Sequence, residues 1–193
     1  MKKGTLICAT ALSALLFSFK TTDATTWSVD KSHAKLGFTI THLMVSDVEG
    51  SFKSFDATIT STKEDFSDAL VNMSADMSSV NTENEKRDEH LKSADFFDIA
   101  NYPTMTYMST SFKKAGNGKY IVKGMLTLHG VTKPVELTAV SRMGTNPMSK
   151  KTVAGFKITG KIKRTDFGIS TGTPSSMLSD EVEIVANTEF AKG

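Results

Sequence analysis

Apolar and polar side chains alternate along most of this chain, and the alternation constrains its fold more than any other feature. The alternating segments are residues 34–42, 48–59, 69–77, 102–112, 120–128, 134–142, 156–163 and 182–190. A period of two is typical of β-strands with one buried face, because successive side chains point to opposite sides of a strand. The pattern predicts eight or nine strands. Short turn signals between them, such as residues 116–118, indicate antiparallel hairpins.

The parity of the apolar positions changes within one of these segments. Val48 and Phe52 occupy even positions, whereas Phe55 and Ile59 occupy odd ones. A slip of one residue inside a continuous strand predicts a β-bulge, and a bulge bends the strand that carries it.

Long antiparallel strands with one apolar face can bury that face in a two-sheet sandwich or in a closed barrel. The bulge and three interior glycines (Gly50, Gly124 and Gly160) favour closure, because a sheet can curl at such points. A barrel of about eight strands encloses either packed side chains or one small ligand. The sequence therefore predicts an all-β fold, an antiparallel eight-stranded barrel.

One segment departs from the alternation. Residues 81–92 are strongly charged, with Thr82 as a candidate N-cap and Glu85 three positions later, which is the spacing of a capping box. We expect a short helix here that links two strands across one end of the barrel. Its mixed charges are typical of a solvated helix, although Arg87 or His90 could point into the barrel mouth.

The N-terminus has the composition of a secretory signal peptide. Lys2 and Lys3 precede an uncharged run of 15 residues, Thr5 to Phe19, and small residues end at Ala24. We expect cleavage after residue 24, a barrel domain over residues 25–193, and a periplasmic or secreted location. The run is shorter than the roughly 20 residues that span a bilayer, so we do not expect an integral membrane protein.

The charge balance argues against one class of partner. The full chain has 23 basic and 21 acidic residues, and residues 1–24 contain three lysines and one aspartate, so 20 of each remain after cleavage. A neutral domain is not expected to bind nucleic acid, which requires many Lys and Arg contacts to phosphate. The only cysteine, Cys8, lies in the predicted leader, so the mature domain must be stabilised by its core.

Residue types that often carry chemistry form no catalytic or metal-binding pattern in the sequence. No two of the four histidines lie three to five residues apart, and the predicted mature chain has no cysteine, so the spacing indicates no zinc site. No Gly-x-Ser-x-Gly elbow is present. We therefore predict no catalytic residue, no metal and no cofactor. The basic positions of residues 157–164 face acidic positions of the last strand, which favours cross-strand ion pairs over an anion site.

The apolar parity of the strands predicts the inner wall of the barrel. No charged residue occupies that face, so a cavity there would suit an apolar molecule, and flexible methionines suit a chain-like one. The expected wall residues are Phe38, Ile40, Phe52, Met73, Met77, Leu126, Phe156, Ile158, Ile162 and Ile184.

Several motifs resemble the YceI-like polyisoprenoid-binding family, in the order in which that family carries them. The motifs are residues 27–42 (WSVDKSHAKLGFTITH), 48–52 (VEGSF), 84–97 (NEKRDEHLKSADFF), 102–103 (YP), 124–134 (GMLTLHGVTKP) and 164–168 (RTDFG). They span nearly the whole predicted mature chain. The residues at polar motif positions are His42, Arg87, Asp88, His90, His129 and Arg164.

The resemblance implies a lipocalin-like barrel whose hydrophobic tunnel holds a polyisoprenoid, an isoprenoid quinone or a fatty-chain amphiphile, without catalysis. Among the polar motif residues, His42, Arg87, His90 and Arg164 are the expected ligand contacts at the mouth. Two alternatives stay open. One is an enzyme acting on such a lipid through His42, His90 and Arg164, and the other is an interaction module whose barrel is filled by its own side chains. A homodimer would form through exposed edge strands.

Overall fold

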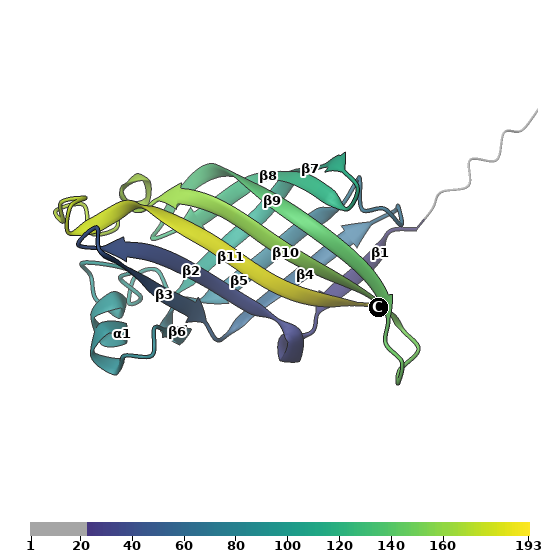
Figure 1. Ribbon diagram of the computed structural model, residues 1–193, viewed down its shortest axis with the longest axis horizontal. Helices are drawn as coiled ribbons and strands as arrows, with labels where there is room; N and C mark the ends of the chain where they lie inside the picture. Colours follow the sequence, from purple (N-terminus) through teal and green to yellow (C-terminus); the bar gives the residue numbers. More distant parts are fainter. Residues whose placement is uncertain (1–22) are drawn as a thin grey trace, which may run out of the picture.

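The computed structural model describes residues 23–193 (Figure 1). The predicted signal peptide, residues 1–24, lies outside the described residues except for its last two positions. The hydrophobic run that suggested it and Cys8 belong to that undescribed part.

The described chain consists mainly of β-strands and the loops between them, with one α-helix and three short 3₁₀ helices among residues 23–193. The strands are β1 (Thr25–Val29), β2 (Lys35–His42), β3 (Ser46–Phe52), β4 (Phe55–Ser61), β5 (Leu70–Asp76), β6 (Val80–Asn81), β7 (Thr104–Gly116), β8 (Lys119–Leu128), β9 (Val131–Thr145), β10 (Thr152–Lys163) and β11 (Leu178–Lys192). The helices are α1 (Glu85–Lys92), η1 (Lys31–His33), η2 (Met77–Ser79) and η3 (Arg164–Phe167).

Eight antiparallel strands close into a barrel, as the alternation predicted. The strands pair in the order β1, β4, β5, β7, β8, β9, β10 and β11, and β11 pairs with β1 to complete the ring. The remaining strands β2, β3 and β6 extend the sheet from β11 toward α1, at the left in Figure 1. They lie beyond breaks in longer strands: β2 continues β1, β3 precedes β4, and β6 follows β5.

The strand predicted to carry a β-bulge between residues 48 and 59 is not continuous, because β3 ends at Phe52 and β4 begins at Phe55. At this break the backbone N–H of Lys53 donates to the Ser79 carbonyl at 3.1 Å, and the N–H of Ser54 donates to the Ser79 hydroxyl at 3.0 Å. Ser79 ends η2, which interrupts the neighbouring strand at the same level. Two adjacent breaks therefore bend the wall together, as a bulge does in a curved sheet.

The three interior glycines make room for large side chains inside the barrel. A Cβ on Gly50 would lie 2.2 Å from Cζ of Phe38, and one on Gly160 would lie 2.3 Å from Cδ2 of Leu137. Residues 50 and 160 are the direct register partners of residues 38 and 137 on the neighbouring strands. Each large side chain thus lies across the glycine of the neighbouring strand. Apolar side chains therefore occupy part of the barrel interior next to these glycines.

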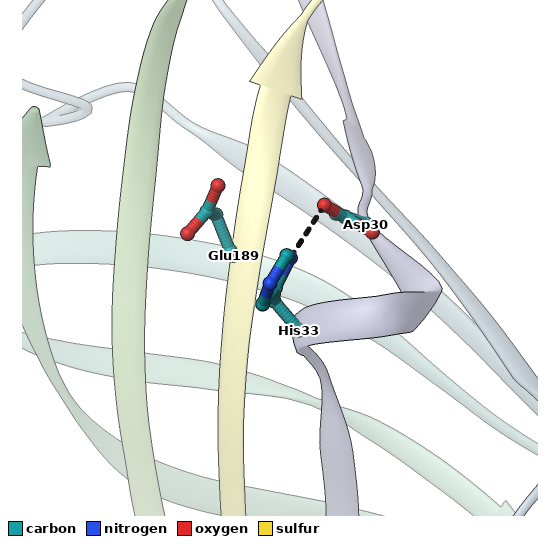
Figure 2. Close-up of side chains that lie close together, drawn as sticks. All are labelled: Asp30, His33 and Glu189. Atoms are coloured by element: carbon teal, nitrogen blue, oxygen red, sulfur yellow. Dashed lines mark hydrogen bonds and ion pairs between the residues drawn. The ribbon is translucent and has the colours of Figure 1, made fainter. Parts of the chain in front are cut away.

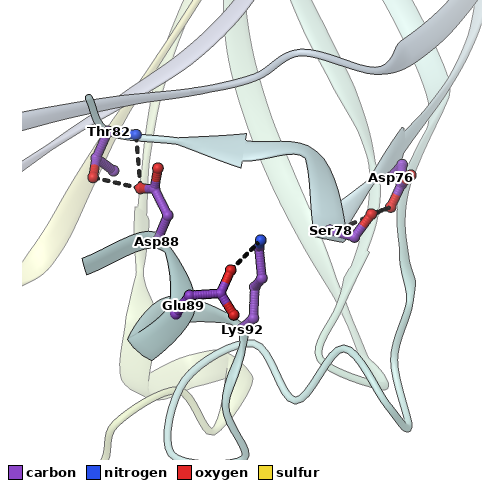
Figure 3. A network of polar contacts seen from close by, with 6 residues as sticks. All are labelled: Asp76, Ser78, Thr82, Asp88, Glu89 and Lys92. Atoms are coloured by element: carbon purple, nitrogen blue, oxygen red, sulfur yellow. Dashed lines mark hydrogen bonds and ion pairs between the residues drawn. The ribbon is translucent and has the colours of Figure 1, made fainter. Parts of the chain in front are cut away.

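The helix begins later than the sequence indicated. The predicted N-cap, Thr82, is wrong: the helix runs from Glu85 to Lys92 and is capped by Asn84, whose side-chain oxygen accepts the Arg87 N–H at 3.1 Å. Thr82 is buried instead, and both its backbone N–H and its hydroxyl donate to Asp88 (Figure 3). In residues 23–193, no helix has the length and apolar character needed to cross a bilayer.

One basic residue of β10, Lys161, forms ion pairs with acidic residues of β11, as expected from the parity of the two strands. Lys161 Nζ lies 2.6 Å from a Glu181 carboxylate oxygen and 3.4 Å from one of Glu183. Arg164 is the exception, because it is buried and contacts neither carboxylate. The expected cross-strand ion pairs are therefore formed at Lys161, and Arg164 has a different role.

Candidate functional site

The barrel contains one large apolar cavity of about 510 Å³ among the described residues. This volume lies in the range of about 300–1,000 Å³ that is usual for small-molecule sites. The cavity follows the inner face of the sheet and reaches the surface at the end of the barrel that carries α1, where exposed residues such as His42, His90 and Met177 line it. The hollow core argues against the alternative of a barrel filled by its own side chains.

The opposite end of the barrel is filled by a cluster of aromatic rings. Phe66, on the loop between β4 and β5, is 1% exposed and packs against Trp27 and Phe156, with ring centroids 5.2 and 5.3 Å away. Phe156 in turn packs edge-on against Phe112 and Phe190. Phe112, Phe156 and Phe190 line the cavity, so this cluster, the aromatic floor, forms its closed end.

Thirteen of the fourteen residues that the sequence predicted as ligand contacts line this cavity. They are Phe38, Ile40, His42, Phe52, Met73, Arg87, His90, Leu126, Phe156, Ile158, Ile162, Arg164 and Ile184. That they contact a ligand stays a prediction.

The remaining predicted contact, Met77, is buried but does not line the cavity. The alternation does not extend to it, because β5 ends at Asp76 and the chain turns into η2. The turn is stabilised by the Asp76 carboxylate, which accepts the backbone N–H of Ser78 at 2.8 Å (Figure 3). Met77 therefore packs in the core outside the tunnel.

Polar side chains within the tunnel bond to the barrel itself. The hydroxyl of Tyr107 donates to the Val122 carbonyl at 3.3 Å, and burial raises the pKa of Tyr107 to about 12. Thr188 donates to the Phe156 carbonyl at 3.4 Å. Within residues 23–193, every buried side-chain nitrogen and oxygen has a hydrogen-bond partner. The inner wall thus presents no unpaired polar group that a ligand would have to satisfy.

The mouth contains the polar groups that a ligand could reach. Arg87 of α1 donates from Nε to the Thr82 hydroxyl and from Nη2 to the Thr82 carbonyl, both at 2.8 Å. These bonds hold the guanidinium against the rim, while Nη1 makes no hydrogen bond to the described residues. His90, one turn along α1, packs edge-on against Phe96 with centroids 4.8 Å apart, and His42 lies at the end of β2.

Arg164 lines the cavity but uses its hydrogen-bonding capacity on the backbone of the loop between β10 and β11 and of the first two residues of β11. The residue is only 2% exposed. Its guanidinium donates to the carbonyls of Ile169, Ser170, Thr173, Leu178 and Ser179. An arginine has five N–H donors, so these bonds account for all of them. Arg164 is therefore the organising residue of the loop between β10 and β11, and it retains no donor for a headgroup.

Two further motif residues, Asp88 and His129, lie outside the cavity lining. Asp88 is buried and accepts both hydrogen bonds from Thr82, so it joins α1 to the residue that follows β6. His129 Nδ1 lies 2.9 Å from the Phe167 carbonyl, and its ring packs edge-on against Tyr102. Both residues connect the mouth segments to the barrel.

A candidate group of metal ligands occurs elsewhere, on the outer surface. Asp30, His33 and Glu189 offer one ligand atom each, all within 4.8 Å of one another (Figure 2). His33 Nδ1 already bonds to Asp30 Oδ2 at 2.8 Å, and the other Asp30 oxygen accepts the Ser32 N–H and caps η1. The spacing of histidines along the sequence could not reveal this group, because Glu189 lies on β11, more than 150 residues later in the sequence than His33. None of the three lines the cavity.

Sequence periodicity also missed the cavity residues that lie on loops. Phe96, Phe97, Ile169, Thr173 and Met177 line the mouth from the segments after α1 and after η3. Apolar and polar residues do not alternate in these segments, so the sequence pattern could not indicate which side chains face the cavity. The positions of Phe96 and Phe97 within a family motif were the only signal.

Comparison with known proteins agrees with this architecture. A family model described as the YceI-like domain matches residues 27–190. The protein named YceI from Salmonella newport (strain SL254) is 41% identical over 192 residues, covering 98% of this chain and 97% of the relative.

Solved structures share the fold. The YCEI protein of Campylobacter jejuni superposes with a TM-score of 0.72 at 35% identity and covers 79% of this chain and 90% of its own. A domain from Saccharophagus degradans described as polyisoprenoid binding superposes with a TM-score of 0.63 at 18% identity, covering 86% of this chain and 98% of its own. The second likeness is one of fold.

Proposed function

The chain belongs to the YceI-like domain family, and from this membership together with the tunnel we propose that it is a carrier of a polyisoprenoid or a similar long-chain amphiphile. The observation that carries the proposal is the cavity of about 510 Å³ whose inner wall consists of apolar side chains and hydrogen-bonded polar ones. An apolar chain loses no hydrogen bonds to water on entering such a space, whereas a polar ligand would.

The energetics favour selection by size and shape. Each buried methylene contributes roughly 0.8 kcal/mol, so a chain of some tens of carbons would nominally exceed the affinity ceiling of roughly 20 kcal/mol. Ordering a flexible chain opposes much of this gain. The wall therefore discriminates by the length and width of the chain, and an isoprenoid, an isoprenoid quinone or a fatty chain of matching size would each fit.

Arg87 is the candidate contact for the ligand's polar end. Its Nε and Nη2 are held by Thr82, so the guanidinium is fixed in orientation at the mouth while Nη1 remains to donate. A fixed guanidinium suits an oxygen-bearing headgroup, such as a phosphate or a carbonyl. His42 and His90 line the same opening and complete the polar rim.

Binding is favoured over turnover by the geometry of the polar residues. The enzyme alternative required His42, His90 and Arg164 to act on a ligand, but Arg164 gives its five donors to loop carbonyls. In the part of the chain that the structure describes, no hydrogen bond joins His42 or His90 to a carboxylate that would orient it. A nucleophile or base in an active site is normally positioned by such a partner.

The proposed site of action is the periplasm or the exterior of the cell, after removal of residues 1–24. This location follows from the sequence of the leader, with its paired lysines and uncharged run. N-terminal sequencing of the exported protein should begin at Thr25.

Native mass spectrometry of the exported protein, followed by organic extraction, tests the carrier proposal. We expect one apolar molecule per chain, released by solvent and identified by fragmentation. The same protein should take up an added polyprenol after delipidation. A protein that is isolated without ligand and refuses both isoprenoid and fatty chains would contradict the proposal.

A further inference from the structure

The turn between β2 and β3 exposes three consecutive apolar side chains. Leu43, Met44 and Val45 are 51%, 65% and 86% exposed. Met177 is 52% exposed, and its carbonyl accepts the Leu43 N–H at 2.9 Å, so it lies beside the turn. We call these four residues the apolar tip. Clusters of exposed apolar residues commonly mark sites that contact another apolar phase.

The apolar tip lies at the mouth of the tunnel. His42, which immediately precedes the turn, lines the cavity, and so do Met177 and Leu178. In Figure 1 the turn projects at the end of the barrel that carries α1, beside the loop between β10 and β11. The exposed apolar surface is thus continuous with the cavity wall, whereas the aromatic floor closes the far end.

The backbone of this turn does not favour the residues that occupy it. Leu43 and Met44 have φ values of 51° and 57°, and the Val45 N–H bonds to the His42 carbonyl at 3.1 Å. Turns with positive φ at both central positions favour Asn and Gly, because other side chains are strained there. Large apolar residues at such positions reduce the stability of the turn, so a role in contact with something outside the barrel explains them better than folding does.

We propose that the apolar tip inserts into the surface of a lipid bilayer, so that the ligand passes between bilayer and tunnel without crossing water. This inference rests on the proposed carrier function, because the store from which a long apolar chain must be drawn is a membrane. The contact is hydrophobic: Leu43–Val45 carry no charge, and the nearest acidic group on the hairpin, Asp47, accepts a hydrogen bond from Thr41. Attraction to anionic lipid is not required.

A vesicle transfer assay tests the proposal. Delipidated protein is mixed with phosphatidylcholine vesicles that contain a fluorescent polyprenol, and the loading rate is measured against vesicle concentration. Transfer during contact should accelerate as vesicle concentration rises. The double variant Met44→Asp/Val45→Asp should load about tenfold more slowly, because a charged tip partitions poorly into the bilayer surface. The loading rate should depend little on salt.

Two matched variants separate membrane contact from damage to the fold. The double variant Met148→Asp/Ser149→Asp introduces the same two charges on the β9–β10 loop, at a 90% exposed methionine and its neighbour, outside the cavity lining, and should leave the loading rate unchanged. Met44→Asn removes apolar surface at a position whose backbone favours Asn. It should slow loading while stability is kept or increased.

Loading of the same polyprenol from detergent micelles distinguishes this inference from the carrier proposal. If the wild-type protein does not bind the polyprenol from micelles, the carrier function itself fails. If it binds from micelles but the tip variants load from vesicles at the wild-type rate, membrane contact through the apolar tip is refuted. Slower vesicle loading with equal final binding from micelles supports it.

Discussion

The phenol ring of Tyr107 lies directly over Gly124 of the neighbouring strand. A Cβ on residue 124 would lie 2.5 Å from Cζ of the ring and 2.5 Å from the carbonyl oxygen of Met108. The ring can rotate away, but the Met108 carbonyl belongs to a paired strand and cannot move without breaking the ladder. Position 124 is therefore closed to any side chain by backbone as well as by a ring.

Alanine substitutions at three strand glycines should therefore differ in cost. Gly124→Ala should destabilise the protein by about 2–3 kcal/mol through overpacking, because a backbone atom blocks the methyl group. Gly160→Ala should cost less, since the atom in its way is the flexible tip of Leu137. Gly155→Ala is the control, because its nearest neighbour would be at an ordinary 3.7 Å. Urea unfolding measures the three values, and equal costs at positions 124 and 155 would contradict this explanation.

A charge placed on the tunnel wall should abolish ligand uptake. Ile158→Asp puts a carboxylate into the cavity, where an ionised group without a partner costs several kcal/mol, so binding of a polyprenol should fall by more than about tenfold. Thr159→Asp adds the same charge to the outer side of the same strand and should leave binding unchanged. Fluorescent polyprenol titration reports both values. Unchanged polyprenol binding by a folded Ile158→Asp variant would contradict the prediction that this residue contacts the ligand.

The wall could be predicted because alternation and closure obey simple geometry. Once a strand such as β10 has one apolar face, Phe156, Ile158 and Ile162 must share a side, and closing the sheet turns that side inward. The same argument was wrong for Met77, because β5 ends one residue before it, at Asp76. Asp76 and the serines after it are turn formers, and treating them as such would have excluded Met77.

The mouth could not be predicted in the same way. Thr82 and Asn84 are both good N-cap residues, and the choice between them depends on Asp88, which binds Thr82 and leaves Asn84 to cap α1. The role of Arg164 was open for a similar reason, because its carbonyl partners lie on a loop without any periodic pattern. Contacts between irregular segments depend on the folded loop, which local sequence does not encode.

Replacing Arg164 with lysine should destabilise the loop between β10 and β11 although the charge is kept. An ammonium has three donors and no planar fork, so at least two carbonyls would lose their partner. With about 1–3 kcal/mol for each buried group left unpaired, we expect a loss near 3 kcal/mol, or about 6–12 °C in Tm. Lys163→Ala, at an exposed neighbour, should change Tm little. A thermal shift below about 2 °C for Arg164→Lys would contradict its organising role.

The Asp30–His33 pair should give a local pH dependence. The hydrogen bond from His33 to Asp30 raises the pKa of His33 above its usual value near 6.5 and lowers the pKa of Asp30 below 3.8. A raised histidine pKa stabilises the fold below pH 6.5 and loses this effect as pH rises through the folded-state pKa. A lowered aspartate pKa stabilises above pH 3.8 and loses this effect as pH falls through its folded-state pKa. The pair is thus fully effective between about pH 4 and 6.5.

An NMR titration of the His33 ring measures this effect. Asp30→Asn should move the midpoint down toward 6.5, the ordinary histidine value. Glu189→Gln should move it by a smaller amount, since Glu189 acts only through its charge at a distance while Asp30 also accepts the hydrogen bond. Equal shifts in the two variants would show that the hydrogen bond is not the dominant cause.

The aromatic floor gives the tunnel a single opening, and this determines the order of events for any chain it holds. The apolar tail must enter first and the polar end last, so the headgroup is always the part presented at the rim. Departure must reverse the same path. An incoming molecule cannot push the resident one out from behind, so exchange requires an empty intermediate. Dwell time should therefore grow with the number of carbons that must be withdrawn, and ligands of different length would be sorted by how long they stay.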